Sequence, residues 1–175
     1  RHTRYISVTG VQTCALPISY ELVATDRHGY LFYDASGLMA TVIQRDGRST
    51  FAKSDPTPQE AFAAVTTYGG HFGTFDVDEG AHTVTHHTQG SFDPNDTGVD
   101  LRYRYQVSGD RLALTVFAAG DGAVPTTWKR LPDRTNLTPL ERRFVGFKRL
   151  VSNEVKDDKG QILPGPAGEI GRAHV

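Results

Sequence analysis

Three histidines and two tyrosines are the residues whose types and spacing suggest chemistry. His82, His86 and His87 lie in the segment AHTVTHHTQGS, and Tyr103 and Tyr105 lie in VDLRYRYQVS. On a strand, His82 and His86 share one face but lie ~14 Å apart, because the chain rises ~3.4 Å per residue, and His87 points to the opposite face. They cannot chelate one ion without ligands from other strands. We expect them to hydrogen-bond within a sheet or, with an ordinary pKa of about 6.5, to orient or protonate a ligand.

Alternation places Tyr103 and Tyr105 on the same strand face as Leu101 and Val107. Such a stripe normally fills a core, but a barrel of about eight strands either fills itself with side chains or holds one small ligand. Tyrosine suits a pocket because it combines apolar area with one hydroxyl. We therefore expect five residues to contact a ligand, namely Tyr103, Tyr105, His82, His86 and Trp128.

The remaining motifs assign no catalytic centre. The segment GSFDPNDTG carries Asp93, Asn95 and Asp96, but it lacks the EF-hand spacing with its closing glutamate and predicts Asx turns instead. The chain contains no G-x-S-x-G motif, no phosphate-cradling glycine loop and no H-E-x-x-H. The sequence thus predicts no catalytic residue, no metal and no cofactor.

The elements that must position these residues are mostly short strands. Aromatic and aliphatic runs flank turn residues in three predicted hairpins, at 34–37, 78–80 and 108–110. Residues 126–131 are expected to form a closing strand. One helix is predicted to begin after Thr57, with Pro58 in its first position and Glu60 completing a capping box. The fold class is all-β and mainly antiparallel, an up-and-down barrel with one short inserted helix.

Both ends of the chain are predicted to be foreign to the protein. The stretches TCALPI and EIGRAHV can be opposite-strand translations of one short DNA, which resembles a common sequencing-library adapter, and RHTRYIS resembles its outer part. We expect residues 1–18 and 169–175 to be adapter-derived, and 19–168 to be a metagenomic fragment of a longer gene. A missing native start leaves a signal peptide and the localisation open.

Composition narrows the classes of partner. Excluding the ends removes Cys14, the one cysteine of the chain, so disulfides and thiol chemistry are excluded for the fragment. The chain carries 19 basic and 20 acidic residues, without the basic cluster that nucleic-acid binding requires. No apolar run approaches the ~20 residues of a membrane span. The sequence does not indicate an oligomeric state.

Several stretches together indicate a family. HGYLFYDASGLMA, YGGHFGTFDVDEGAHTVTHHTQGSFDPN and TTWKRL resemble the lipocalin-like domain of bacterial and fungal proteins, a calycin-type barrel. The resemblance covers residues 19–131 and restarts near Phe144, where VGFKRLVS is similar to the Gly-x-Trp-x-Leu-Val-Ser motif that opens these domains. Lys148 stands in place of its tryptophan.

The resemblance implies a parent with two tandem barrels. Residues 19–131 would be a first barrel whose own first strand is missing or replaced, 132–140 a linker, and 141–168 the start of a second repeat. A barrel that lacks one strand exposes two unpaired edges. We therefore expect residues 144–155, a relative of the lost strand, to fill the vacant position as an accidental circular permutation.

Three functions fit this organisation. The leading hypothesis is a barrel that binds a small apolar or amphipathic molecule in its interior. The first alternative is an isomerase or cyclase-type enzyme that uses the same cavity, with His86 or a tyrosine as acid or base. The second is a filled barrel with a structural or interaction role. A cavity would argue against the filled barrel, and a buried histidine with a shifted pKa beside it would favour the enzyme.

Overall fold

The computed structural model describes residues 18–117, 125–148, 155–156 and 162–163. Its strands are β1 (Ile18–Leu22), β2 (Arg27–Tyr33), β3 (Leu38–Arg45), β4 (Tyr68–Asp78), β5 (Thr83–Ser91), β6 (Asp100–Ser108), β7 (Arg111–Val116), β8 (Thr126–Arg130), β9 (Val155–Lys156) and β10 (Ile162–Leu163). Its helical segments are α1 (Pro58–Thr66), the 3-10 turn η1 (Pro94–Asp96) and α2 (Pro139–Arg142).

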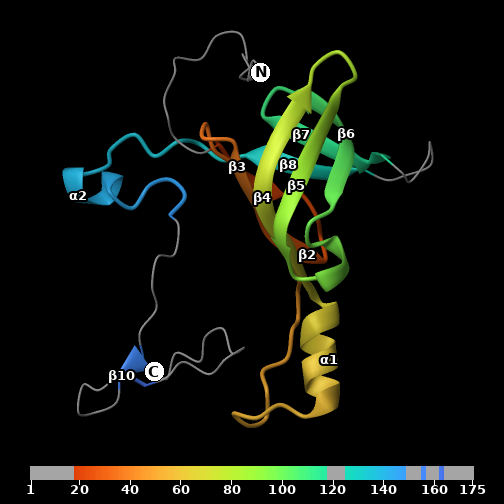
Figure 1. The fold of residues 1–175 in the computed structure, drawn as a ribbon, viewed down its shortest axis with the longest axis vertical. Helices are drawn as coiled ribbons and strands as arrows, with labels where there is room; N and C mark the ends of the chain where they lie inside the picture. Colours follow the sequence, from red (N-terminus) through yellow and green to blue (C-terminus); the bar gives the residue numbers. More distant parts are fainter. Residues whose placement is uncertain (1–17, 118–124, 149–154, 157–161, 164–175) are drawn as a thin grey trace.

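Strands β1 to β8 form a closed antiparallel barrel in which every strand pairs with its neighbours in the sequence (Figure 1). The three predicted hairpins join β2 to β3, β4 to β5 and β6 to β7. Gly37 and Gly109 have positive φ angles of 83° and 59° in two of these turns, which a residue without a side chain adopts readily. The predicted all-β, up-and-down barrel with a short inserted helix is confirmed.

The position of the first strand is occupied by β1. Tyr20 lies opposite Leu31 of β2 and opposite Arg130 of β8, so β1 closes the ring on both sides. The prediction that residues 144–155 take this position is therefore wrong. Phe144 follows the short α2 and is 76% exposed, and residues 149–154 lie outside the described part of the chain. A five-residue strand suffices because it satisfies the edges of both β2 and β8.

A β-bulge between β4 and β5 fixes the pairing at one point of the wall. Phe72 lies opposite Gly90, but the next residue, Gly73, lies opposite Thr88, so the register shifts by one residue. A Cβ atom on Gly73 would lie 2.0 Å from the carbonyl oxygen of His87, a distance that no side chain tolerates. Glycine is therefore required where the two backbones approach most closely.

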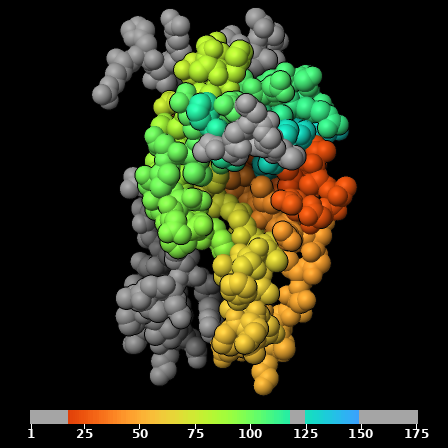
Figure 2. Space-filling view, turned by 90° about the vertical axis from the view of Figure 1, so that its right-hand side faces the viewer, coloured from red at the N-terminus to blue at the C-terminus, as the bar shows by residue number. Residues whose placement is uncertain are grey.

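Helix α1 begins with the predicted capping box. The Thr57 hydroxyl accepts from the Glu60 N–H at 3.3 Å, and the Glu60 carboxylate accepts from the Thr57 N–H at 2.8 Å. None of its residues is buried, and the helix projects beyond the barrel (Figures 1 and 2). No helix within the described residues is long and apolar enough to cross a membrane.

The interior of the barrel has two chemically different sides. The fully buried side chains of β1, β7 and β8 are mainly apolar, and we call them the apolar wall: Leu22, Leu112, Leu114 and Trp128. Alternation on β2 to β5 turns a set of polar side chains inward, which we call the polar wall: Tyr33, Thr41, His71, His86 and Thr88. Leu31, Met39 and Val84 pack between the two.

Candidate functional site

The polar wall is built by strand alternation around His86. This residue shares the inward face of β5 with Val84 and Thr88, and it is only 1% exposed. Thr41 of β3 lies directly opposite His71 of β4, which brings their side chains to neighbouring positions on the inner surface. Five polar residues from four adjacent strands therefore converge inside a barrel whose other side is apolar.

A continuous chain of hydrogen bonds runs through this wall. The Oη atom of Tyr33 lies 2.7 Å from Nε2 of His86, and Nδ1 of His86 lies 3.0 Å from Nε2 of His71. A neutral imidazole has one donor nitrogen and one acceptor nitrogen. The chain therefore has a direction, and either Tyr33 or His71 donates to His86.

Burial moves the titration of these groups away from neutral pH. Burial, assisted by the nearby His71 and His87, lowers the pKa of His86 to about 3. Burial also lowers the pKa of His71, an effect that Asp96 opposes, and it raises the pKa of Tyr33 far above its ordinary value. His86 is therefore an uncharged hydrogen-bonding group at neutral pH.

Aromatic rings surround the hydrogen-bonded chain. The ring of Tyr33 lies 4.6 Å from that of Phe75 and 6.4 Å from that of Tyr20, in tilted and edge-on geometry. The ring of Tyr103 lies 4.9 Å from that of His86. Burial raises the pKa of Tyr20 and that of Tyr103, so both keep their hydroxyl protons at neutral pH. The surroundings of the chain are apolar in area, and each tyrosine adds one hydroxyl.

Three buried polar atoms have no hydrogen-bond partner among the described residues. They are Oγ1 of Thr41, Oγ1 of Thr88 and Nε1 of Trp128, in residues that are 8%, 3% and 3% exposed. Leaving a buried polar group unpaired costs about 1–3 kcal/mol, so most such groups in proteins are satisfied. Two of these atoms belong to the polar wall and one faces it from the apolar wall.

The inner surface reaches solvent at one end of the barrel. Val116 shares the inward face of β7 with Leu112 and Leu114, yet it is 50% exposed. Tyr103, directly opposite Val116 on β6, is half-buried. This end also carries η1, whose Asp96 is close enough to influence the pKa of both His71 and Tyr103.

Comparison with known proteins agrees with this architecture. The family model described as a lipocalin-like domain matches residues 17–131, which contain all eight barrel strands. The chain belongs to the lipocalin-like domain family. No curated protein and no solved structure matches it. The match contains the predicted range 19–131, and membership shows the barrel of a small-molecule-binding fold without naming a ligand.

The predicted ligand residues of this lipocalin-like barrel occupy different places. His86 and Tyr103 are in contact on the inside, and Trp128 is buried on the apolar wall. Tyr105 packs against the core from β6, and its ring lies 5.9 Å from that of His82. His82 itself is exposed in the turn before β5 with a φ of 50°, so the alternation of the strand does not extend to it.

Sequence analysis missed Tyr33, His71, Thr41 and Thr88. His71 lies between Gly70 and Phe72 in a glycine-rich stretch that shows no alternation, although it pairs across the strands with Thr41. Tyr33 ends the run YLFY, whose aromatic and aliphatic residues occupy both faces of β2. The polar residues at alternate positions of β5 indicated a polar strand face, but the neighbouring strands were needed to show that this face points into the barrel.

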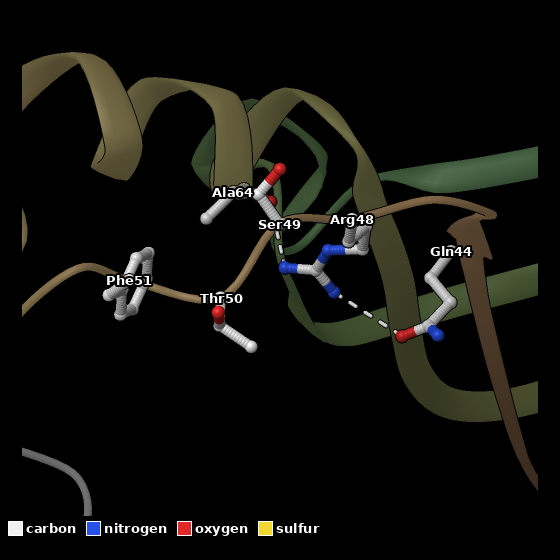
Figure 3. Close-up of a pocket in the computed structure, with 6 residues that line it drawn as sticks. All are labelled: Gln44, Arg48, Ser49, Thr50, Phe51 and Ala64. Atoms are coloured by element: carbon white, nitrogen blue, oxygen red, sulfur yellow. Dashed lines mark hydrogen bonds between the residues drawn. The ribbon is translucent and has the colours of Figure 1, made fainter.

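Outside the lipocalin-like barrel, an open groove of about 390 Å³ lies between α1 and the segment after β3 (Figure 3). Its cation is already engaged. The Arg48 guanidinium donates to Oε1 of Gln44 at 3.3 Å and to the carbonyl of Ala64 at 3.2 Å, and it lies over the Tyr68 ring. These contacts tie the segment to the end of the helix, so the groove has a structural explanation.

The described residues contain no group of three or more histidine, cysteine, aspartate or glutamate side chains placed to hold a metal ion. His87, on the outer face of β5, does have two aspartate partners. Its ring nitrogens lie 2.7 Å from Asp100 and 3.0 Å from Asp76. The hydrogen bond to Asp100 is the main cause that raises the pKa of His87, and Asp76 adds to it, while partial burial opposes both. His86 and His87 are thus adjacent in sequence, but their pKa values are shifted in opposite directions.

Proposed function

We propose that the barrel binds one small amphipathic molecule in its interior, with the polar group of the ligand against the polar wall. The observation that carries this proposal is the set of unpartnered buried atoms, Thr41 Oγ1 and Thr88 Oγ1 above all. A ligand polar group can hydrogen-bond with either hydroxyl, since each accepts and donates, and so offset the desolvation that folding has already imposed. Membership of the lipocalin-like family supports the same role for the interior.

The apolar part of the ligand is accommodated by the opposite side. Leu112, Leu114 and Trp128 present apolar surface across the interior from His86 and Thr88. The open grooves beside α1 lie outside the barrel, so a ligand that enters at the Val116 end has to separate side chains of the two walls to contact both kinds of surface. Ligand sites of this kind are mostly apolar, with a few polar groups that fix orientation.

His86 is a buried histidine with a shifted pKa, the feature expected of the enzyme, but the direction of its shift favours binding over catalysis. A general acid or base works best when its pKa lies near the operating pH. The pKa of His86 is lowered to about 3 and that of Tyr33 is raised, so the pKa values of these two hydrogen-bonded partners both lie far from neutral pH. Their hydrogen bond holds and orients a ligand group well but transfers a proton poorly.

The single tryptophan of the chain provides the test. Trp128 is buried on the apolar wall, so an apolar molecule inside the barrel changes its fluorescence. Titration with the uncharged probe N-phenyl-1-naphthylamine is expected to quench Trp128 saturably, with one probe per barrel. Probe binding without any change in Trp128 emission would place the probe on the outer surface and refute the proposal.

A matched pair of variants tests the role of the polar wall. Thr88→Val removes an inward hydroxyl, and Thr85→Val removes one from the same strand on its outer face. We expect Thr88→Val to weaken the binding of an amphipathic alcohol about 5-fold, because one buried hydrogen bond is worth roughly 1 kcal/mol. Thr85→Val should leave the affinity unchanged. Equal affinities in both variants, measured by Trp128 fluorescence, would exclude Thr88 from the site.

A further inference from the structure

We propose that the polar wall selects uncharged ligands: the molecule is an amphiphile whose polar group is a hydroxyl or a carbonyl, not a carboxylate or an ammonium. This inference rests on the proposed function and names the class of ligand. It stands on the hydrogen-bond geometry of Tyr33, His86 and His71 and on the charges that face them.

The hydrogen-bonded chain can serve either a neutral ligand acceptor or a neutral ligand donor. When His71 donates to His86 and His86 donates to Tyr33, the Tyr33 hydroxyl hydrogen is free for a ligand carbonyl. When Tyr33 donates to His86 instead, its oxygen is left to accept from a ligand hydroxyl. The distances of 2.7 and 3.0 Å fit both directions. Both nitrogens of His86 are engaged within this chain of hydrogen bonds, and burial keeps the ring uncharged.

The charges around the wall disfavour an anion. Asp96 lies at the rim, and its negative charge acts on both His71 and Tyr103. Arg130, beside Tyr20, lies 3.5 Å from Asp133, which offsets its charge. The other adjacent titratable group, His87, faces outward between two aspartates. A carboxylate at the polar wall is therefore repelled by Asp96, while Arg102 and Arg104 of β6 lie over the Phe117 ring, on the strand face opposite that of Tyr103.

A quaternary ammonium is disfavoured for a different reason. It has no hydrogen-bonding atom, so Thr41 Oγ1 and Thr88 Oγ1 would stay unpartnered when it binds. The polar wall contains no carboxylate, and the acid that acts on its His71, among the described residues, is Asp96 at the rim. An ion moved from water to such a surface loses solvation that neutral groups do not replace.

Three amphiphiles with the same ten-carbon chain test the inference. Decan-1-ol, decanoate and decyltrimethylammonium, each below its aggregation concentration at pH 7.5, compete with N-phenyl-1-naphthylamine while Trp128 is observed. We expect decan-1-ol to bind at least ~10-fold more tightly than either ion, since an unpaired charge in a buried site costs more than one lost hydrogen bond. If decanoate or decyltrimethylammonium binds as tightly as decan-1-ol, the inference is overturned while the proposed function stands. If none of the three binds, the proposed function itself fails.

A second pair of variants isolates the charge at the rim. Asp96→Asn keeps the backbone hydrogen bonds of η1, in which the Asp96 N–H donates to Asp93 and the Asp96 carbonyl accepts from Val99. We expect it to tighten decanoate binding ~5-fold and to leave decan-1-ol unchanged, because it removes one repulsive charge at short range. Asp110→Asn removes the same charge from the hairpin at the opposite end of β6 and should alter neither. An unchanged ratio of the two affinities in Asp96→Asn would show that Asp96 does not discriminate.

Discussion

The two walls of the barrel interior follow the same backbone rules and differ in what they contribute. The apolar wall on β1, β7 and β8 buries leucine and tryptophan side chains that gain stability simply by leaving water. The polar wall on β2 to β5 holds a hydrogen-bonded chain of one tyrosine and two histidines, and two hydroxyls that have no partner in the described part of the molecule. The apolar wall therefore stabilises the fold, whereas the polar wall includes unpaired hydroxyls that oppose folding and that the proposed ligand would satisfy.

The difference extends through the thickness of the polar wall. On β5, His86 points inward and loses its charge through burial, while His87 points outward and is held by Asp76 and Asp100. The outer face thus favours a charged histidine and the inner face a neutral one, as the proposed binding of an uncharged molecule requires. A single strand with alternating sides achieves both because successive side chains point in opposite directions.

The largest effect is expected from the apolar wall. Leu114→Ala should lower the free energy of unfolding by about 3 kcal/mol, because it removes a buried side chain and leaves a cavity between strands. Val107→Ala is the matched control, since Val107 lies near the end of β6 and is 59% exposed, and it should cost less than about 0.5 kcal/mol. Urea unfolding measures both. A small effect of Leu114→Ala would mean that this wall does not carry the stability of the barrel.

The sequence predicted the apolar wall more completely than the polar one. Alternation in β6 and the run LALTV in β7 each indicate which strand face points inward, so the inward position of Tyr103 could be predicted from the local pattern. His71 did not, because glycines on both sides of its segment remove the pattern and a β-bulge resets the register beside it. Non-local pairing, such as that of Thr41 with His71, is not written in any local stretch.

The start of β5 and the closure of the barrel by β1 also could not be predicted from local sequence patterns. The start of β5 at Thr83 depends on a turn in which His82 adopts a φ of 50°, a conformation that a strand pattern does not anticipate. The closure of the barrel by β1 depends on the pairing of Leu22 with Trp128, more than a hundred positions away in the chain. Tertiary pairing decided both, which is why the circular permutation was wrongly predicted.

The next largest effect is expected on the pH dependence of stability, which should differ between the inward His86 and the outward His87. His86 is neutral in the folded state down to about pH 3, whereas in the unfolded chain it binds a proton below its ordinary pKa of 6.5. Its contribution to stability is therefore complete above pH 6.5 and is lost as the pH falls toward 3, by up to roughly 1.4 kcal/mol per unit. In His86→Gln this part of the slope should disappear, as measured by urea unfolding between pH 4.5 and 6.5.

The neighbouring histidine provides the control with the opposite sign. Asp100 and Asp76 raise the pKa of His87 in the folded state, so its contribution is present below pH 6.5 and is lost as the pH rises through the raised pKa. His87→Gln should therefore alter the pH dependence only above pH 6.5. If both variants changed the same pH range, the inward and outward faces of β5 would not differ in the way described here.

The smallest effect tests whether the polar wall is indeed unfavourable for folding. Thr41 is 8% exposed, and its hydroxyl has no partner among the described residues. Valine has nearly the same shape, so Thr41→Val removes the unpaired hydroxyl and leaves the packing in place. We expect the variant to unfold about 1 kcal/mol less readily than the parent, since replacing an unsatisfied buried group by an apolar one of equal shape removes its desolvation cost.

If the polar wall binds the ligand as proposed, adding the ligand should reduce or reverse the stability advantage of Thr41→Val over the parent. In saturating decan-1-ol the parent gains stability in proportion to its affinity, while Thr41→Val, with one fewer hydrogen bond to the ligand, gains less. The advantage of the variant in urea unfolding should therefore shrink as the alcohol is added. Thr85→Val, on the outer face of β5, should show no such dependence on ligand. A Thr41→Val variant that is less stable than the parent without any ligand would show that its hydroxyl is already paired within the folded protein, and the polar wall would then be complete on its own.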